Sequence, residues 1–142
     1  MKTILMITFF LVMMNASAQQ SSAVVDMKIH KIVMQFSNGD STQQMGVITQ
    51  LGNIREAWPN AKIEVVCHSF GLDLLTSAKS KVGKQIASFS EQGVTFAACN
   101  NTMKRRNVKK EDLLPVAVVV PSAMLELVSK QEINWKYLKA GY

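Results

Sequence analysis

Apolar positions along this chain form two kinds of pattern, which alternate from about residue 31 onward. Short runs rich in β-branched residues predict strands, and they cover residues 31–36, 63–67, 94–98, 116–120 and 135–138. Between these runs, apolar residues recur at helical spacing. The predicted helices cover residues 41–58, 72–91 (in one piece or two) and 122–131, with shorter helical segments at 102–106 and 110–114.

Several of the strand runs are apolar at consecutive positions, and residues 116–120 are apolar throughout. A parallel sheet that is covered by helices on both faces requires this pattern, because neither face of its strands meets water. Strands that alternate with helices through short connections form three-layer α/β domains. No repeat or second domain is evident, so residues 28–142 are predicted to be a single α/β domain. Residues 135–138, in which polar and apolar residues alternate, are predicted to form an edge strand.

The first eighteen residues follow a different pattern. A positively charged start at Met1 and Lys2 leads into an apolar run from Ile4 to Met14, and Ala16-Ser17-Ala18 provides small residues for cleavage. These are the three parts of a secretory signal, and the apolar run is shorter than the ~20 residues of a membrane-spanning helix. We therefore expect removal of residues 1–18, a flexible lead-in over residues 19–27, and a periplasmic or secreted protein without a membrane anchor.

The composition excludes several classes of protein. The chain has 142 residues, of which 48% are hydrophobic and 18% charged, and this balance argues against a disordered or fibrous protein. Two Cys and two His are too few for a zinc module or a disulfide framework. Asp40, His68 and Cys99 lack metal-ligand spacing, and no glycine motif indicates a nucleotide cofactor. We expect neither a metal nor a cofactor.

The formal net charge is +6, and basic residues are densest between residues 104 and 110. Acidic residues follow at once at Glu111 and Asp112, and no aromatic residue lies nearby for stacking on bases. Nucleic-acid binding is therefore not expected. A solvated helix face is the simplest interpretation of the basic cluster, and a surface for a small anion or an acidic partner is the more specific one.

Candidate functional residues lie where predicted strands end, because ligands of parallel α/β sheets bind at the carboxyl ends of the strands. Three loops there carry polar or reactive side chains, at residues 38–40, 68–71 and 99–101. Together with the basic residues that follow, they provide these candidate binding residues: Asn38, Asp40, Asn100, Asn101, Lys104, Arg105 and Arg106.

Cys99 is the most informative of these positions. It ends a strand and precedes a basic helix, and both the helix dipole and nearby cations favour the nucleophilic thiolate. The alternative is an ordinary buried cysteine. Cys67 lies inside an apolar run and is expected in the core, but export would also permit a Cys67–Cys99 disulfide. His68 is either a base that assists Cys99 or a residue of the surface or the packing.

Several segments, in this order, resemble the DsrE/DsrF-like sulfur-relay family over about residues 30–138. Gly93-Val94 followed by an apolar strand that ends in Cys99 is the most specific of them. Arg105-Arg106 resemble a basic pair of some members, although Asn107 replaces their glycine. The matching segments are residues 30–33, 65–68, 92–102, 111–114 and 119–122.

The resemblance implies a three-layer α/β/α sandwich with a mostly parallel five-stranded sheet, assembled as a homotrimer or homohexamer. In members that relay sulfur, a cysteine at the position of Cys99 carries a persulfide and passes it to a partner. We therefore expect an exported carrier of sulfane sulfur, at most transferase-like, that meets a donor or an acceptor protein. The alternative is a non-catalytic exported oligomer that binds a small molecule or a protein, in which Cys99 is structural or redox-sensing.

Overall fold

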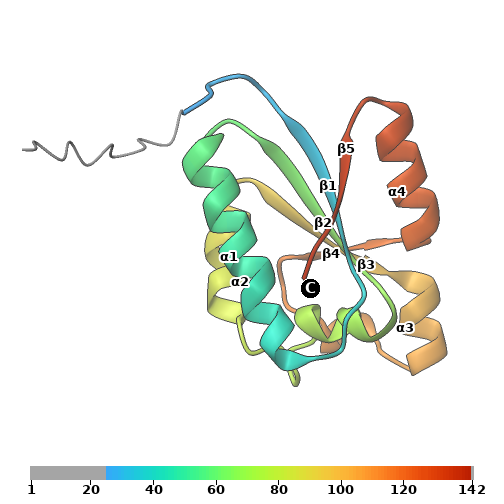
Figure 1. Ribbon diagram of the computed structural model, residues 1–142. Helices are drawn as coiled ribbons and strands as arrows, with labels where there is room; N and C mark the ends of the chain where they lie inside the picture. Colours follow the sequence, from blue (N-terminus) through green and yellow to red (C-terminus); the bar gives the residue numbers. More distant parts are fainter. Residues whose placement is uncertain (1–24, 142) are drawn as a thin grey trace, which may run out of the picture.

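The computed structural model describes residues 25–141, which form a five-stranded sheet with helices on both sides (Figure 1). The strands lie in the order β4-β3-β2-β1-β5, and all four pairings are parallel. Their carboxyl ends therefore meet at one edge of the sheet. The bounds are β1 Lys31–Phe36, β2 Lys62–Cys67, β3 Val94–Cys99, β4 Ala117–Val120 and β5 Lys136–Lys139.

Two helices lie on each side of the sheet. On one side are α1 (Ser41–Ala57) and α2 (Gly83–Glu91), and on the other are α3 (Asn100–Arg106) and α4 (Ala123–Glu132) (Figure 1). Two short 3-10 helices, η1 (Ser69–Leu75) and η2 (Lys110–Asp112), complete the domain. The three-layer α/β/α sandwich is therefore confirmed.

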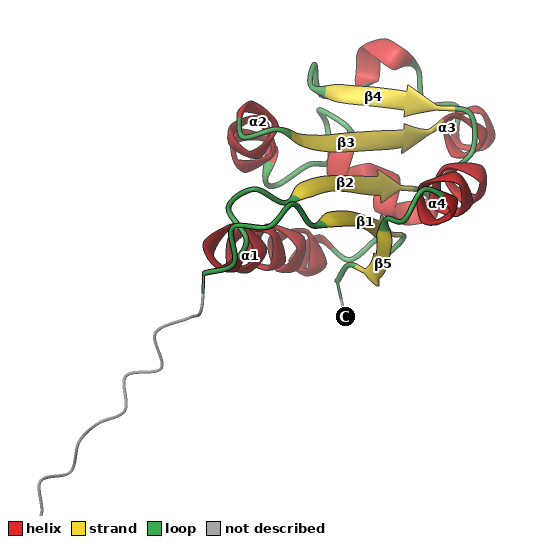
Figure 2. Ribbon diagram, turned by 90° about the horizontal axis from the view of Figure 1, so that it is seen from above, coloured by secondary structure: helices red, strands yellow, loops and turns green. Residues whose placement is uncertain are grey.

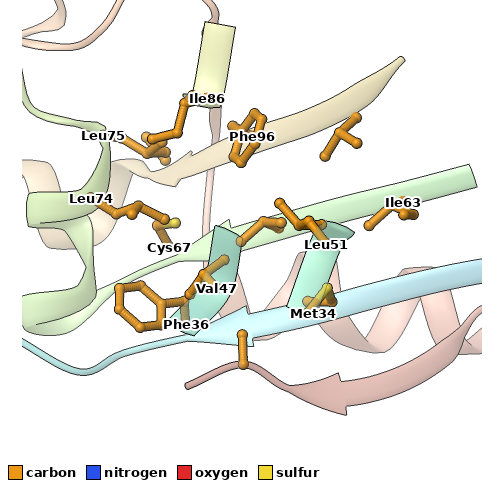
Figure 3. Close-up of a cluster of buried hydrophobic side chains, with 14 of the residues drawn as sticks. Met34, Phe36, Val47, Leu51, Ile63, Cys67, Leu74, Leu75, Ile86 and Phe96 are labelled. Carbon is orange, nitrogen blue, oxygen red and sulfur yellow. The ribbon is translucent and has the colours of Figure 1, made fainter. Parts of the chain in front are cut away.

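The core is divided by the sheet into two clusters. Because side chains alternate along a strand, Phe36, Cys67 and Phe96 face α1, α2 and η1 in the larger cluster (Figure 3). The smaller cluster lies on the opposite face, under α4. Its buried members are Val33, Val66, Ala97, Cys99, Ala123 and Leu127.

The segment predicted as helix over residues 72–91 differs from the expectation. It consists of η1, a connection in which Thr76 pairs with Leu113, and α2, which begins only at Gly83. Gly71 explains the irregular start, because a Cβ at this position would lie 2.4 Å from the carbonyl oxygen of Phe36. The close approach of two backbones places η1 directly against the end of β1.

The apolar strand β4 is also less covered than expected. Val118 and Val119 are exposed, although their run was predicted to be buried on both faces. The reason lies in the strand order: β4 is an edge strand, and α4 packs on β1, β2 and β5 instead. The edge strands are therefore β4 and β5, and the position of β5 agrees with the edge strand predicted for residues 135–138.

Part of the predicted N-terminal organisation lies outside the described residues, namely the signal at residues 1–18 and the lead-in up to residue 24. Residues 25–27 form neither helix nor strand, and the backbone N–H of Asp26 donates to the carbonyl of Ala57 at 2.9 Å. Within residues 25–141, no helix has both the length and the apolar character that crossing a bilayer requires.

Candidate functional site

A pocket of about 260 Å³ lies where β2 and β3 end, and it brings Cys99 and His68 together. Figure 2 shows the arrowheads of these strands pointing toward α3 and α4, which flank this edge of the sheet. The wall therefore combines residues from four elements. They are His68, Ser69, Cys99, Asn101, Thr102, Arg105, Ser122, Ala123 and Met124.

The sulfur of Cys99 accepts a hydrogen bond from the N–H of Ala123, the first residue of α4, at 3.3 Å. The Cys99 side chain forms no capping hydrogen bond with α3. Burial raises the pKa of the Cys99 thiol. The hydrogen bond from Ala123, and the polar groups of Asn101 and Thr102 at the start of α3, outweigh burial, so the pKa lies below its usual value. The amino end of α4 thus donates to a sulfur atom at the end of β3, a contact that the sequence did not indicate.

His68 is neutral in this arrangement. Burial, followed by the charge of Arg105, lowers its pKa. Its Nε2 accepts from the side-chain amide of Gln35 at 2.7 Å, and its Nδ1 lies 3.1 Å from the hydroxyl of Ser69. The hydroxyl of Tyr137 donates to the oxygen of the same Gln35 amide.

Two of the predicted binding residues line the pocket beside Cys99. Asn101 and Arg105 are exposed on its wall, and both lie on α3. Neither side chain has a hydrogen bond or an ion pair with a described residue. Their amide and guanidinium groups are therefore available to an anionic or polar ligand.

Arg106 has a different role from the predicted one. Its Nη2 forms a salt bridge of 2.7 Å with Asp73, and its Nη1 donates to the carbonyl of Ser69 at 2.9 Å. Its guanidinium also lies 5.3 Å from the ring centre of Phe70. These contacts tie α3 to η1, and so Arg106 supports the site without lining the pocket.

The remaining predicted binding residues lie outside the pocket. Asp40 caps α1, because its Oδ1 accepts from the N–H and the hydroxyl of Thr42, each at 2.8 Å. Asn38 accepts from the N–H of Asp40 at 2.9 Å. Asn100 is half-buried and Lys104 is exposed, and neither is part of the pocket wall.

The predicted Cys67–Cys99 disulfide is absent, and both thiols are free. Cys67 pairs with Ala98 across the sheet, so Cys99 is one position further along and faces the opposite side. The two strands are neighbours, but the alternation of side chains places the two sulfurs on opposite faces of the sheet. Burial raises the pKa of the Cys67 thiol far above its usual value.

The site residues predicted from the sequence did not include Gln35, Thr102 and Ala123. Thr102 stood inside a predicted basic helix, and Pro121-Ser122 signalled only that another helix began there. The contacts that give these residues a role join distant parts of the chain. Among residues 25–141 no group of three or more His, Cys, Asp or Glu side chains could hold a metal ion.

Comparisons with known proteins agree with this fold. A solved protein of unknown function, MTH1491 from Methanobacterium thermoautotrophicum, matches with a TM-score of 0.72 at 27% identity, over 80% of this chain and 99% of its own. The ychN protein from E. coli matches with a TM-score of 0.64 at 16% identity, over 78% of this chain and 98% of its own, a likeness of fold alone.

No match was found among curated proteins. The model of the DsrE/DsrF-like family, in contrast, matches residues 7–140. That match includes every strand and helix of the sandwich as well as the pocket around Cys99. The chain therefore belongs to the DsrE/DsrF-like family.

Proposed function

We propose that this protein carries sulfane sulfur as a persulfide on Cys99 and passes it to a partner. The observation that supports this function is the placement of the Cys99 sulfur at the wall of a pocket, where the N–H of Ala123 donates to it at 3.3 Å and its pKa lies below the usual value. Donors that stabilise the thiolate favour the nucleophilic form of cysteine. Family membership supports the same chemistry, since the family includes sulfur relays.

The transfer needs no external oxidant or reductant. The Cys99 thiolate attacks the outer sulfur of a donor persulfide, an S–S bond forms at Cys99, and the donor leaves as a thiolate. In the second step, an acceptor thiolate attacks the outer sulfur on Cys99, and the Cys99 thiolate is released. Each step breaks one S–S bond and forms another, so the oxidation state of the system is conserved.

The pocket wall offers groups suited to this exchange. Arg105 and Asn101 face the incoming molecule and would bind the negative charge of the departing thiolate. Burial and the charge of Arg105 lower the pKa of His68, so it would add no cation and would assist by orienting the donor. The pocket volume of about 260 Å³ suits the end of a side chain or a small persulfide.

Intact-mass spectrometry after incubation with sodium polysulfide tests the proposal. We expect the reduced protein to gain about 32 Da, one sulfur atom, and dithiothreitol to remove it. The Cys99→Ser variant should gain nothing, and Cys67→Ala should behave like wild type. If the folded site activates the thiol, folded wild-type protein must gain the sulfur atom faster than the urea-unfolded chain. An adduct that persists in Cys99→Ser, or no adduct on wild type, contradicts the proposal.

We also propose that the protein is exported before it acts. The support is the secretory pattern of residues 1–18, which lies outside the structure. Expression of the full chain in a bacterium followed by fractionation should give a periplasmic or secreted protein that begins at Gln19. A cytoplasmic protein that retains Met1 would contradict export and leave the sulfur chemistry untouched.

Assembly with copies of itself is proposed from exposed apolar side chains beside the site. Val118 on β4 and Leu125 and Val128 on α4 are each 46–65% exposed, a pattern typical of interaction surfaces. Light scattering should give a trimer or a hexamer. We expect Leu125→Lys to shift the oligomer toward the monomer. Ile29 is equally exposed but lies at the opposite end of the sheet, so Ile29→Lys should leave the oligomer unchanged. A monomeric wild type contradicts assembly.

A further inference from the structure

A pocket of about 420 Å³ lies at the opposite edge of the sheet from Cys99. Its wall includes the first residues of β1 and β5, whereas Cys99 is the last residue of β3, and the strands are parallel. No residue lines both this pocket and the one beside Cys99. Its volume falls within the range of about 300–1,000 Å³ that is typical of sites for small molecules.

The strand order leaves this space open. Ile32 and Met34 of β1 face α1, and Lys136 and Leu138 of β5 are their partners in register, so all four side chains lie on the same face of the sheet. On the other face, α4 packs against β5. Because β5 is an edge strand, Leu138 remains 43% exposed, and it lines the pocket together with the buried Ile32.

Another part of the wall is held in place by the segment that precedes β1. The ring of His30 stacks on the indole of Trp58 at the end of α1, with 4.1 Å between ring centres and 21° between planes. The Nε2 of His30 lies 3.2 Å from Oδ2 of Asp26, whose backbone N–H donates to the carbonyl of Ala57 at 2.9 Å. These contacts form the pocket in advance of any ligand, as is usual for binding sites.

The charged side chains of the lining are basic. Lys31 and Lys136 are exposed, and neither ammonium group has an ion pair with a described residue. The side-chain amide of Asn134 also lines the pocket and forms no hydrogen bond within residues 25–141. No Asp or Glu belongs to the lining. Two cations and an amide donor beside an apolar surface are complementary to an anion with an apolar body.

We propose that this pocket binds a small organic carboxylate, with its apolar body against Trp58 and Leu138 and its charge beside the two lysines. The proposal goes beyond the sulfur chemistry of Cys99, because the two pockets lie at opposite edges of the sheet. A negative result in the persulfide assay would therefore leave it unaffected.

Calorimetric titration with 2-naphthoate at low ionic strength tests the proposal. We expect saturable binding of one molecule per chain. The matched compound 2-naphthamide has the same shape without the charge, and it should bind about fivefold more weakly. Nuclear magnetic resonance then locates the ligand: the indole N–H signal of Trp58 should move more than that of Trp135, which packs in the core cluster on the opposite face.

Two matched pairs of variants test the role of charge. Lys136→Met should weaken binding of 2-naphthoate about fivefold, whereas Lys84→Met, at an exposed position on α2 outside the lining, should not change it. Ile29 lines the pocket and is 64% exposed, so it accepts a polar side chain. Ile29→Glu should weaken binding more than Ile29→Gln, because the two side chains differ in charge and hardly in size.

Three results would overturn the proposal. The first is the absence of saturable binding to the wild-type protein, as expected if a second copy or another segment of this chain fills the pocket. The second is equal affinity for the carboxylate and the amide, with equal effects of Lys136→Met and Lys84→Met. The third is a larger movement of the Trp135 signal than of the Trp58 signal.

Discussion

Cys67 and Cys99 end neighbouring parallel strands, yet their side chains lie on opposite faces of the sheet. Cys67 is enclosed by the larger core cluster with no exposed surface, whereas Cys99 is part of the pocket wall and receives a hydrogen bond from the first residue of α4. Two thiols in adjacent strands therefore have opposite chemistry: burial suppresses ionisation of the first, and local donors promote ionisation of the second.

Selective modification of the two cysteines should follow from this difference. Under native conditions at neutral pH, iodoacetamide should label Cys99 at least tenfold faster than Cys67, because the thiolate is the reactive form and Cys67 is inaccessible. In urea both should react at similar rates. Peptide mapping by mass spectrometry gives the two rates separately, and equal labelling in the folded protein would contradict the assignment.

Asp40 should affect stability and leave the chemistry of Cys99 unchanged. Asp40→Ala removes the acceptor for the N–H of Thr42 at the start of α1, so the thermal midpoint should fall. The alkylation rate of Cys99 should not change, because Asp40 lies outside the pocket. Asp40→Ser, which retains a capping oxygen, serves as the matched control. A change in the alkylation rate of Cys99 in the Asp40→Ala variant would show that Asp40 does contribute to the site.

Gly71 and Gly52 provide a matched pair of glycine substitutions. Gly71→Ala places a Cβ against the Phe36 carbonyl and should destabilise the fold by several kcal/mol, because two backbones would have to separate. Gly52 lies inside α1 with no atom within 4 Å of an added Cβ, and Gly52→Ala should stabilise by about 1 kcal/mol. Urea unfolding measures both, and equal effects would contradict the close contact at Gly71.

The buried carboxyl of Glu64 should make stability depend on pH. Burial raises its pKa, and the hydrogen bond and charge of Lys130 offset this only in part. The folded state therefore retains the proton of Glu64 to higher pH than the unfolded state, in which the pKa of the carboxyl is 4.5. Protonated Glu64 therefore contributes its full stabilisation below the unfolded pKa, and this stabilisation is lost as the pH rises through the folded pKa.

Glu64→Gln isolates this contribution, because the amide keeps an acceptor for Lys130 and does not titrate. The free energy of unfolding of wild type, measured relative to Glu64→Gln by urea titration, should decline as pH rises above 4.5. A difference that stays flat or grows with pH would show that Lys130 fully compensates for burial. Tertiary contacts set this behaviour, since Glu64 and Lys130 lie 66 residues apart.

Local sequence patterns were sufficient to predict the strands, the helices and the three layers of the domain. The runs at residues 31–36, 63–67 and 94–98 match β1, β2 and β3 within one residue at each end, because alternation and β-branching act over a few neighbouring positions. Consecutive apolar residues also indicated a sheet covered on both faces. Cys99 at the end of β3 and the start of a helix followed from the same local reading.

Contacts between distant parts of the chain determined the features that local sequence patterns did not predict. Ala123 donates to a sulfur 24 residues earlier, Ser69 donates to Thr102 33 residues later, and Arg106 is bound to Asp73 on another element. These contacts depend on which strands are neighbours and on how helices cross the sheet. The periodicity within one segment carries no information about strand order or helix placement. For the same reason, the exposed valines of β4 and the separated sulfurs of Cys67 and Cys99 emerged only from the assembled fold.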